Sequence, residues 1–338
     1  MARRKGRPVD GVLLLNKPTG MTSNQALQRA KRLFFVEKAG HTGSLDPLAT
    51  GVLPLCFGEA TKFSQFLLDA DKRYRSTFVL GMTMSTSDAD GEMLVQKSAA
   101  AITQAQVLEA LEQFKGDILQ VPPMYSALKH QGQPLYKMAR QGIEIERAPR
   151  PVTVYAIELL AFRGGELAEV DVDIRCSKGT YIRSIAEDLG FALGCGGHVK
   201  TLHRSAAGLF DESQCISLDD LNAQFEAALP AVIEGDTDTL LDKTAAYAAL
   251  DTHLLSADAP VASLPAIYLP ESSAYYFRLG NPVMDAQAFK IKAQDAIVRV
   301  FCAETDHSSA QFLGLAEITD DGRVAPKRII ANRSVNEG

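Results

Sequence analysis

A glycine-rich turn around one aspartate constrains this chain more than any other feature. Residues 40–51 read Gly-His-Thr-Gly-Ser-Leu-Asp-Pro-Leu-Ala-Thr-Gly, with three glycines and one proline. This composition does not suit a helix or a central strand, and it favours a bent backbone that another group can approach closely. Pro47 restricts Asp46 to an extended conformation. Asp46 is therefore a candidate catalytic carboxylate on a stiff loop. The alternative is an ordinary turn in which Asp46 accepts hydrogen bonds from nearby backbone N–H groups.

The length and composition indicate a globular protein with two domains. The chain has 338 residues, of which 46% are hydrophobic and 22% charged. It has no apolar stretch of the roughly 20 residues that a membrane span requires, and its basic N-terminus lacks the apolar part of a secretion signal. The five cysteines are widely spaced, so we expect no disulfide and no structural zinc site. We expect a cytoplasmic monomer without a metal or a membrane partner.

Charge is distributed unevenly along the chain. Residues 1–75 contain thirteen Lys and Arg against six Asp and Glu, a net charge of +7. Residues 211–260 contain one lysine against eleven acidic residues, a net charge of −10. The N-terminal part can therefore attract phosphates although the whole chain is acidic. A merely solvated basic face is the alternative.

The pattern of elements predicts an α+β domain with a mostly antiparallel sheet. We expect helices at residues 22–35, 59–68, 103–114, 135–140 and 181–193. We expect strands at residues 12–15, 74–80, 151–162, 167–176 and 199–209. Few of these follow strict βα alternation, which argues against a parallel sheet.

A second domain is expected after an acidic, alanine-rich and proline-containing segment. Three short β-like runs separated by turn residues predict a small β-barrel or sandwich; they span residues 274–279, 296–301 and 311–318. We therefore divide the chain into a basic tail (1–8), a large domain (9–230), a connecting segment (231–270) and a C-terminal domain (271–333).

Several motifs in series resemble those of the bacterial tRNA pseudouridine-55 synthases, the TruB-type family. The turn at residues 40–51 resembles the catalytic signature of that family. The other matching blocks, in the family's order, are Leu-Asn-Lys-Pro-Thr-Gly-Met-Thr-Ser (15–23), Lys-Arg-Tyr (72–74), Thr-Ser-Asp-Ala-Asp-Gly (86–91), Val-Pro-Pro-Met-Tyr-Ser-Ala (121–127) and Cys-Ser-Lys-Gly-Thr-Tyr-Ile-Arg (176–183). Each block alone is a weak signal, but chance does not account for the series. By the same resemblance, the C-terminal domain is expected to be the PUA-like RNA-binding domain that such synthases carry.

The resemblance implies isomerisation of uridine to pseudouridine at position 55, in the T loop of tRNA. This reaction breaks the N1–C1′ bond and rejoins the uracil through C5, with no net redox change, hydrolysis or phosphate transfer. We expect no cofactor, and the chain has no P-loop or Rossmann glycine pattern. Asp46 would be the essential carboxylate, acting by covalent attack, by charge stabilisation or by proton removal. Arg183 is expected to pair with Asp46 and to oppose the rise in pKa that burial causes.

The remaining site residues are carried over from the family's motifs. Because the target uridine must leave its stack, the pocket needs aromatic or apolar faces. Tyr74 is expected to stack on the base and His41 to help displace it. The other expected substrate contacts are Tyr181, Leu202, Lys17, Asp88, Lys200 and Arg204. Lys17 is also expected to brace the Asp46 loop, and turn capping is an equal alternative for Asp88.

Two rival functions remain at this stage. One is a catalytically silent protein that binds or folds RNA on the same scaffold; binding alone does not require Asp46, Tyr74 and Arg183 together. The other is an Asp-dependent hydrolase of nucleosides or glycosides. Such enzymes usually pair two carboxylates, and Asp46 is the only carboxylate of its loop.

Overall fold

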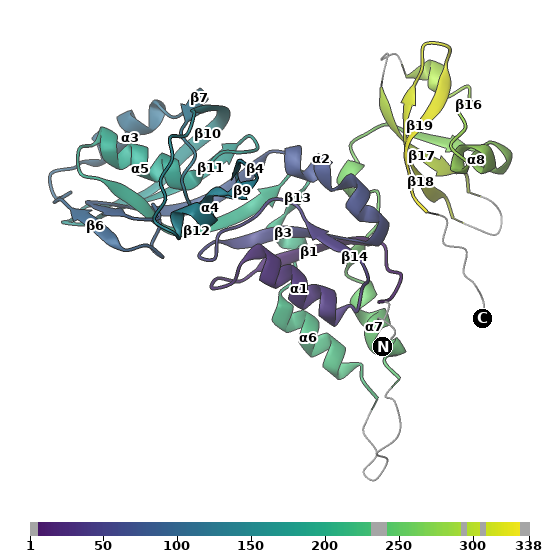
Figure 1. Ribbon diagram of the computed structural model, residues 1–338, viewed down its shortest axis with the longest axis horizontal. Helices are drawn as coiled ribbons and strands as arrows, with labels where there is room; N and C mark the ends of the chain where they lie inside the picture. Colours follow the sequence, from purple (N-terminus) through teal and green to yellow (C-terminus); the bar gives the residue numbers. More distant parts are fainter. Residues whose placement is uncertain (1–5, 231–241, 292–295, 305–308, 332–338) are drawn as a thin grey trace, which may run out of the picture.

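The protein consists of a large sheet-and-helix body and a smaller C-terminal body (Figure 1). The computed structural model describes residues 6–230, 242–291, 296–304 and 309–331. The expected α+β class is confirmed, because a large, mostly antiparallel sheet carries the helices. No helix in the described ranges is long and apolar enough to cross a membrane.

One ten-stranded sheet organises the large body. Eight strands lie in the spatial order β14-β1-β3-β12-β4-β11-β10-β7, with β2 beside β3 and β13 beside β12. Their bounds are β1 (Gly11–Lys17), β2 (Ala39–His41), β3 (Thr50–Phe57), β4 (Lys72–Leu80), β7 (Gly116–Gln120), β10 (Arg150–Arg163), β11 (Ala168–Cys176), β12 (Gly197–Ala207), β13 (Phe210–Asp211) and β14 (Leu254–Leu255). In the described part of this sheet, β3 and β12 are parallel and the other pairs are antiparallel.

Seven α-helices and three 3-10 helices are described in the same body. The α-helices are α1 (Ser23–Leu33), α2 (Ser64–Asp69), α3 (Gln104–Glu112), α4 (Leu135–Ala139), α5 (Ile182–Ala192), α6 (Leu218–Ala227) and α7 (Thr244–Asp251). The 3-10 helices are η1 (Gly58–Phe63), η2 (Glu212–Gln214) and η3 (Ala259–Val261). Two short hairpins complete it, namely β5 (Met82–Met84) with β6 (Met93–Gln96) and β8 (Lys129–His130) with β9 (Gln133–Pro134).

The sheet has a buried face and a charged face, and alternation along β11 distinguishes them. Val170 and Val172 are buried and share the main core with Ile185 and Leu189 of α5. The residues between them, such as Asp171, point the other way and pair with arginine. This period of two is typical of a strand with one covered face. Helix α5 therefore lies on the buried face.

The C-terminal body contains a five-stranded sheet in the order β15-β17-β18-β19-β16. The bounds are β15 (Ala266–Leu269), β16 (Val283–Met284), β17 (Ile297–Cys302), β18 (Gln311–Ile318) and β19 (Arg323–Ile329), with α8 (Glu271–Arg278) and η4 (Ala288–Lys290). The strand expected at 274–279 is wrong, because most of that run belongs to α8. Ala274 and Phe277 are buried while Tyr275 and Tyr276 are exposed, a helical spacing that the aromatic, β-like composition concealed.

The connecting segment is partly built into the large sheet. Residues 231–241 lie outside the described residues, but α7 and β14 follow them. Leu254 and Leu255 of β14 pair with Leu13 and Val12 of β1. Within the expected connecting segment 231–270, β14 thus belongs to the large sheet and β15 to the C-terminal sheet.

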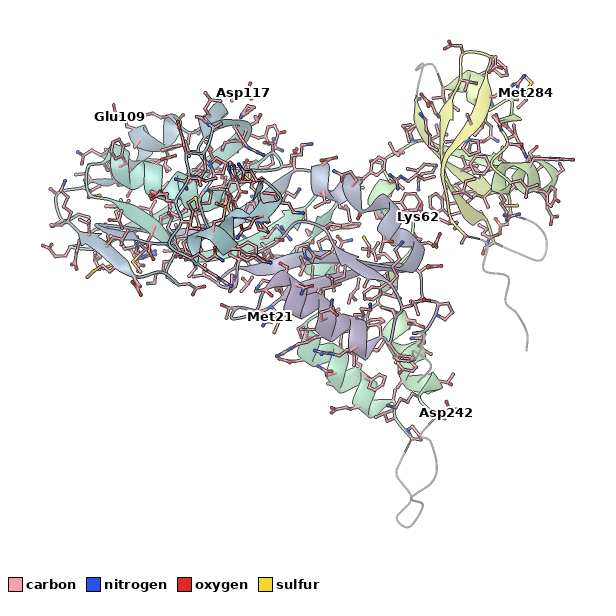
Figure 2. The ribbon with its side chains drawn as sticks, viewed as in Figure 1. Met21, Lys62, Glu109, Asp117, Asp242 and Met284 are labelled. Atoms are coloured by element: carbon pink, nitrogen blue, oxygen red, sulfur yellow. The ribbon has the colours of Figure 1, made fainter. Side chains whose placement is uncertain are left out.

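The two bodies meet at η1. Phe63 packs with Val261, Phe312 and Leu315 in one apolar cluster. The Lys62 ammonium, labelled in Figure 2 at this junction, donates to the carbonyl of Ile329 at 2.8 Å. Contacts of this kind fix the C-terminal body against the sheet that carries the Asp46 loop.

Candidate active site

The Asp46 loop joins β2 to β3 and is held from outside. The Ser23 hydroxyl at the start of α1 accepts a hydrogen bond from the Leu45 N–H at 2.7 Å and donates to the Leu45 carbonyl at 3.1 Å. A Thr22–Gln25 capping box begins α1, so this anchor stands on a well-formed helix end. The backbone on either side of Asp46 is thereby fixed before any substrate binds.

Glycine is required where the loop rejoins the sheet. Gly51 has φ +101°, and a Cβ there would lie 2.3 Å from the Arg204 carbonyl oxygen. A side chain at this position would break the parallel pairing of β3 with β12, which joins Gly51 to Arg204. The close backbone approach that the glycines of this loop predict is the approach of Gly51 to the backbone of Arg204.

Lys17 braces this loop from below. Its side chain is fully buried, and its ammonium donates to the carbonyls of Pro18 at 2.8 Å, Met21 at 2.6 Å and Pro47 at 3.4 Å. Burial lowers the pKa of Lys17 to about 8, and the Asp46 carboxylate opposes that fall. Its three hydrogen bonds all go to backbone carbonyls, which fits the bracing role expected for Lys17.

Arg183 holds Asp46 with two nitrogens. Its Nε lies 3.0 Å from Oδ2 and its Nη2 lies 3.3 Å from Oδ1 of Asp46. The arginine side chain is 5% exposed and the aspartate side chain 37% exposed, so the carboxylate is at the rim and the guanidinium lies beneath it. Partial burial raises the pKa of Asp46, and the Arg183 charge opposes that rise. A two-nitrogen fork of this kind fixes one rotamer of the carboxylate.

The same guanidinium joins three further groups. It donates to the carbonyls of Thr86 at 3.1 Å and Tyr125 at 2.7 Å. The carboxylate of Asp88 lies 3.5 Å from Nη1, and Asp88 is buried. Asp88 also accepts from the Thr86 hydroxyl and from the Asp90 N–H. Asp88 is therefore a second carboxylate of the arginine cluster and caps its own turn, which is the alternative that the sequence left open.

Two tyrosines lie near Asp46. Tyr74 comes from β4 and packs against the main core, and burial raises the pKa of its hydroxyl. Tyr181 immediately precedes α5, and its backbone exchanges hydrogen bonds with the Gln120 amide at 3.0 and 3.2 Å. The Asp46 charge acts on both hydroxyls. Leu202, on the same side of β12 as Arg204, adds a buried apolar residue.

His41 has an unsatisfied nitrogen. Its Nδ1 is buried and has no hydrogen-bond partner among the described residues. Burial lowers the pKa of His41, and the Arg204 charge lowers it further, so the ring is neutral near pH 7. A buried, unpaired ring nitrogen costs free energy.

Arg204 and Lys200, two of the expected substrate contacts, are not exposed on the Asp46 side of the sheet. Arg204 is 1% exposed, and its guanidinium donates to the backbone carbonyls of Val52 and Gly43. Lys200 forms an ion pair with Glu169, which alternates with buried Val170 and so lies on the charged face of the sheet, away from α5. A β-bulge between Val199 and Thr201 turns Lys200 to that face. The basic run 200–204 thus divides between the two faces, which a sequence pattern does not reveal.

We accordingly expect Lys200→Ala to leave the salt dependence of tRNA binding unchanged. A lysine that neutralised a duplex phosphate would contribute a slope of about −0.9 in log affinity against log salt. Lys200 already neutralises Glu169 on the other face. Filter binding of tRNA at several salt concentrations measures the slope, and a slope flatter by about one unit would place RNA on the charged face.

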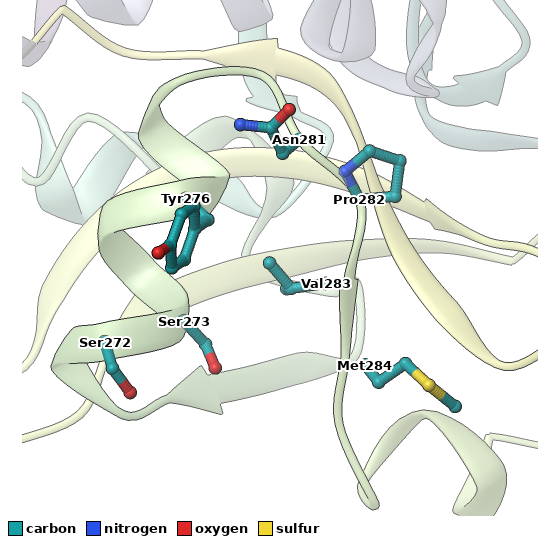
Figure 3. A pocket seen from close by; sticks show the side chains of 7 residues that line it. All are labelled: Ser272, Ser273, Tyr276, Asn281, Pro282, Val283 and Met284. Atoms are coloured by element: carbon teal, nitrogen blue, oxygen red, sulfur yellow. The ribbon is translucent and has the colours of Figure 1, made fainter.

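Two further kinds of site are relevant among the described residues, namely a metal site and a pocket outside the Asp46 region. They contain no group of three or more His, Cys, Asp or Glu that could hold a metal ion. A hollow of about 310 Å³ between α8 and residues 281–284 is shown in Figure 3. Its lining contains no carboxylate and no cation: Ser272, Ser273, Tyr276, Asn281, Pro282, Val283 and Met284. It belongs to the C-terminal body, whereas Asp46 lies in the large body.

Comparison with known proteins covers nearly the whole chain. Residues 31–182 match the model of the TruB family pseudouridylate synthase N-terminal domain. Residues 183–262 match the tRNA pseudouridylate synthase B C-terminal domain, and residues 265–330 match the pseudouridine synthase II TruB C-terminal domain.

Full-length relatives agree with these domain matches. The tRNA pseudouridine synthase B of Saccharophagus degradans is 54% identical over 97% of this chain and 98% of its own length. That of Shewanella denitrificans is 51% identical over 98% and 97%. A solved structure described as an H/ACA RNP bound to a substrate RNA containing 2′-deoxyuridine has a TM-score of 0.65 at 22% identity, covering 96% of this chain and 86% of that one, which shows a shared fold. On the domain models and the full-length relatives, the chain belongs to the TruB family of tRNA pseudouridylate synthases and is a pseudouridine-forming isomerase.

Proposed function

We propose that this enzyme isomerises uridine 55 in the T loop of tRNA, with Asp46 as the essential carboxylate. The observation that carries the proposal is the Asp46 carboxylate itself, which is held at the rim of the site by the Arg183 fork. A carboxylate kept ionised beside a nucleotide can attack a carbon, stabilise positive charge at C1′ or remove a proton. A protein that only bound RNA would gain nothing from a carboxylate facing the phosphates.

The reaction conserves every atom of the uracil. The N1–C1′ bond breaks, the base turns, a C5–C1′ bond forms, and the proton that leaves C5 is replaced by one on N1. Asp46 is positioned to act at the sugar or the base. Arg183 is positioned to keep the carboxylate charged, because its guanidinium opposes the effect of burial.

The aromatic residues support access by base flipping. A uridine stacked in a folded loop must rotate out to be reached, and the pocket must replace the stacking that is lost. The Asp46 charge acts on the hydroxyls of Tyr74 and Tyr181, and these two aromatic residues are the candidates to stack on the flipped base. His41, which is partly exposed and lies at the start of the Asp46 loop, is the residue proposed to help displace the base. Leu202 lines the same side.

The test is to map pseudouridine at single-nucleotide resolution after incubation with unmodified tRNA. The expected product is pseudouridine at position 55 alone. Modification of a different uridine would overturn the assigned position. A protein that bound tRNA and formed no pseudouridine would support the alternative of a silent RNA-binding protein.

Activity is expected to persist in excess EDTA and without any nucleotide or redox cofactor. Isomerisation consumes neither a phosphate bond nor electrons, and Asp46 supplies the charge that the reaction uses. Because magnesium folds tRNA, the assay should use an isolated T-arm stem-loop, whose folding is checked by its melting curve. Loss of activity that zinc specifically restored would contradict the proposal.

A further inference from the structure

We infer that Arg204 is a positioning residue for the proposed reaction, which holds both ends of the Asp46 loop and the catalytic tyrosine with one side chain. Its Nε donates to the carbonyl of Val52 at 2.7 Å, and its Nη2 donates to the carbonyl of Gly43 at 3.2 Å. Gly43 and Val52 flank Asp46 in the sequence, three residues before it and six after. One planar fork therefore sets the width of the loop on which the carboxylate stands.

The backbone of Arg204 reinforces its side chain. Arg204 pairs with Gly51 where β12 runs parallel to β3, and Thr50 contacts the ring of the neighbouring His203 at 2.8 Å. On its other side, β12 pairs Arg204 with Tyr74 of β4. The Arg204 guanidinium lies beside the Tyr74 hydroxyl and opposes the rise in pKa that burial causes there. Arg204 thus contacts both the Asp46 loop and Tyr74, and it links the position of the carboxylate to that of the aromatic ring.

The burial of Arg204 distinguishes it from an ordinary structural arginine. The residue is 1% exposed, and no carboxylate lies within ion-pair distance of it among the described residues. An unpaired buried cation is costly, and backbone carbonyls compensate only part of that cost. Its charge also acts on Lys17 and His41, lowering the pKa of each. Such a cost is consistent with a geometry that the reaction needs, since catalytic groups require placement within about 0.5 Å.

The experiment compares Arg204→Met and Arg204→Lys with Arg299→Met in the full-length enzyme. Arg299 serves as the control because it too is largely buried and donates to a carbonyl, that of Leu264, but it lies in β17 of the C-terminal sheet. Unlike Arg204 it also pairs with a carboxylate, that of Asp258, so its loss is expected to cost at least as much stability. Three quantities are measured for each variant: kcat and KM for tRNA, the thermal midpoint, and hydrogen exchange of backbone amides in residues 43–52.

The expected result is a local defect in geometry. Arg204→Met should lower kcat by roughly 10²-fold, the order expected for a misplaced catalytic group, while KM changes little. Exchange in residues 43–52 should accelerate in Arg204→Met and not in Arg299→Met. Arg204→Lys keeps the charge, but a single nitrogen cannot reproduce the planar fork on the Val52 and Gly43 carbonyls, so it should restore part of kcat and part of the protection. Should Arg204→Met fail to fold, Arg204→Lys carries the comparison.

Two results would overturn the inference. One is a kcat for Arg204→Met within about threefold of wild type, since a misplaced loop costs far more. The other is a loss of kcat that follows the thermal midpoint equally in Arg204→Met and Arg299→Met, with exchange raised across the whole chain. Failure of the proposed function is distinguishable, because the wild type would then form no pseudouridine at position 55 while the exchange measurements still reported on the loop.

Discussion

Asp46→Asn is expected to abolish pseudouridine formation while the fold and most tRNA affinity remain. Asparagine keeps the size of the side chain, so the contacts of the loop through Ser23 and Lys17 are unaffected. What is lost is the negative charge that attack, charge stabilisation and proton removal all require. A rate below roughly 10⁻³ of wild type is expected, the order of effect that removal of an essential catalytic group produces.

The measurement is single-turnover conversion of unmodified tRNA, together with tRNA binding by filter retention. Asp219→Asn serves as the control, because Asp219 is an exposed carboxylate on α6 and takes the same substitution. Pseudouridine formed by Asp46→Asn at even a tenth of the wild-type rate would remove Asp46 from the proposed role.

Arg183→Met is expected to cause the second largest loss of activity. The substitution removes both nitrogens that hold Asp46, and it leaves the carbonyls of Thr86 and Tyr125 without their donor. Removing one partner of a buried ion pair is strongly unfavourable, and we expect kcat to fall by roughly 10²-fold or more. Arg183→Lys should fall between this variant and wild type, because a point charge cannot reproduce the planar fork.

The pH dependence of kcat should also change in a defined direction when Arg183 is replaced. In the proposed mechanism Asp46 acts in its ionised form, so activity should be lost as the pH falls through its pKa. Arg183 holds that pKa down against the effect of burial. Without Arg183 the pKa rises further, and the acid limb of the kcat profile should move to higher pH. An acid limb that stayed in place would show that Arg183 does not set the charge of Asp46.

The sequence motifs predicted the pairing of side chains at the centre of this site, but they could not predict which backbone groups those side chains contact. The pairing of Asp46 with Arg183 was expected from their motifs and is present. The carbonyls of Thr86 and Tyr125 that complete the arginine's coordination leave no trace in residue type, because every residue has a carbonyl. The block 121–127 was recognised as a motif, but its role as an acceptor for Arg183 was not.

Local irregularities explain the other departures from the predictions. The strand 199–209 was expected, yet two bulges in β12 decide which face each residue occupies. Lys200 and Arg204 are both basic residues of the same run, but because of the bulges their side chains lie on opposite sides of the sheet. In α8, tyrosine and phenylalanine favour strands in general, but the burial of Ala274 and Phe277 on one face outweighs that preference.

The spatial order of the strands has a consequence for how the chain folds during its synthesis. Strand β12 is inserted between β3 and β4, which are separated in the finished sheet although they follow one another as long strands in the chain. Asp46 belongs to the half that contains β1 and β3, whereas Tyr74 belongs to the half that contains β4. A nascent chain that has not yet emerged past residue 207 lacks the complete strand that pairs with both β3 and β4. Pairings so distant in sequence form late in folding. We therefore expect Asp46 and Tyr74 to reach their final relative placement only when β12 pairs with both β3 and β4, so a nascent chain should gain activity no earlier than the completion of this strand.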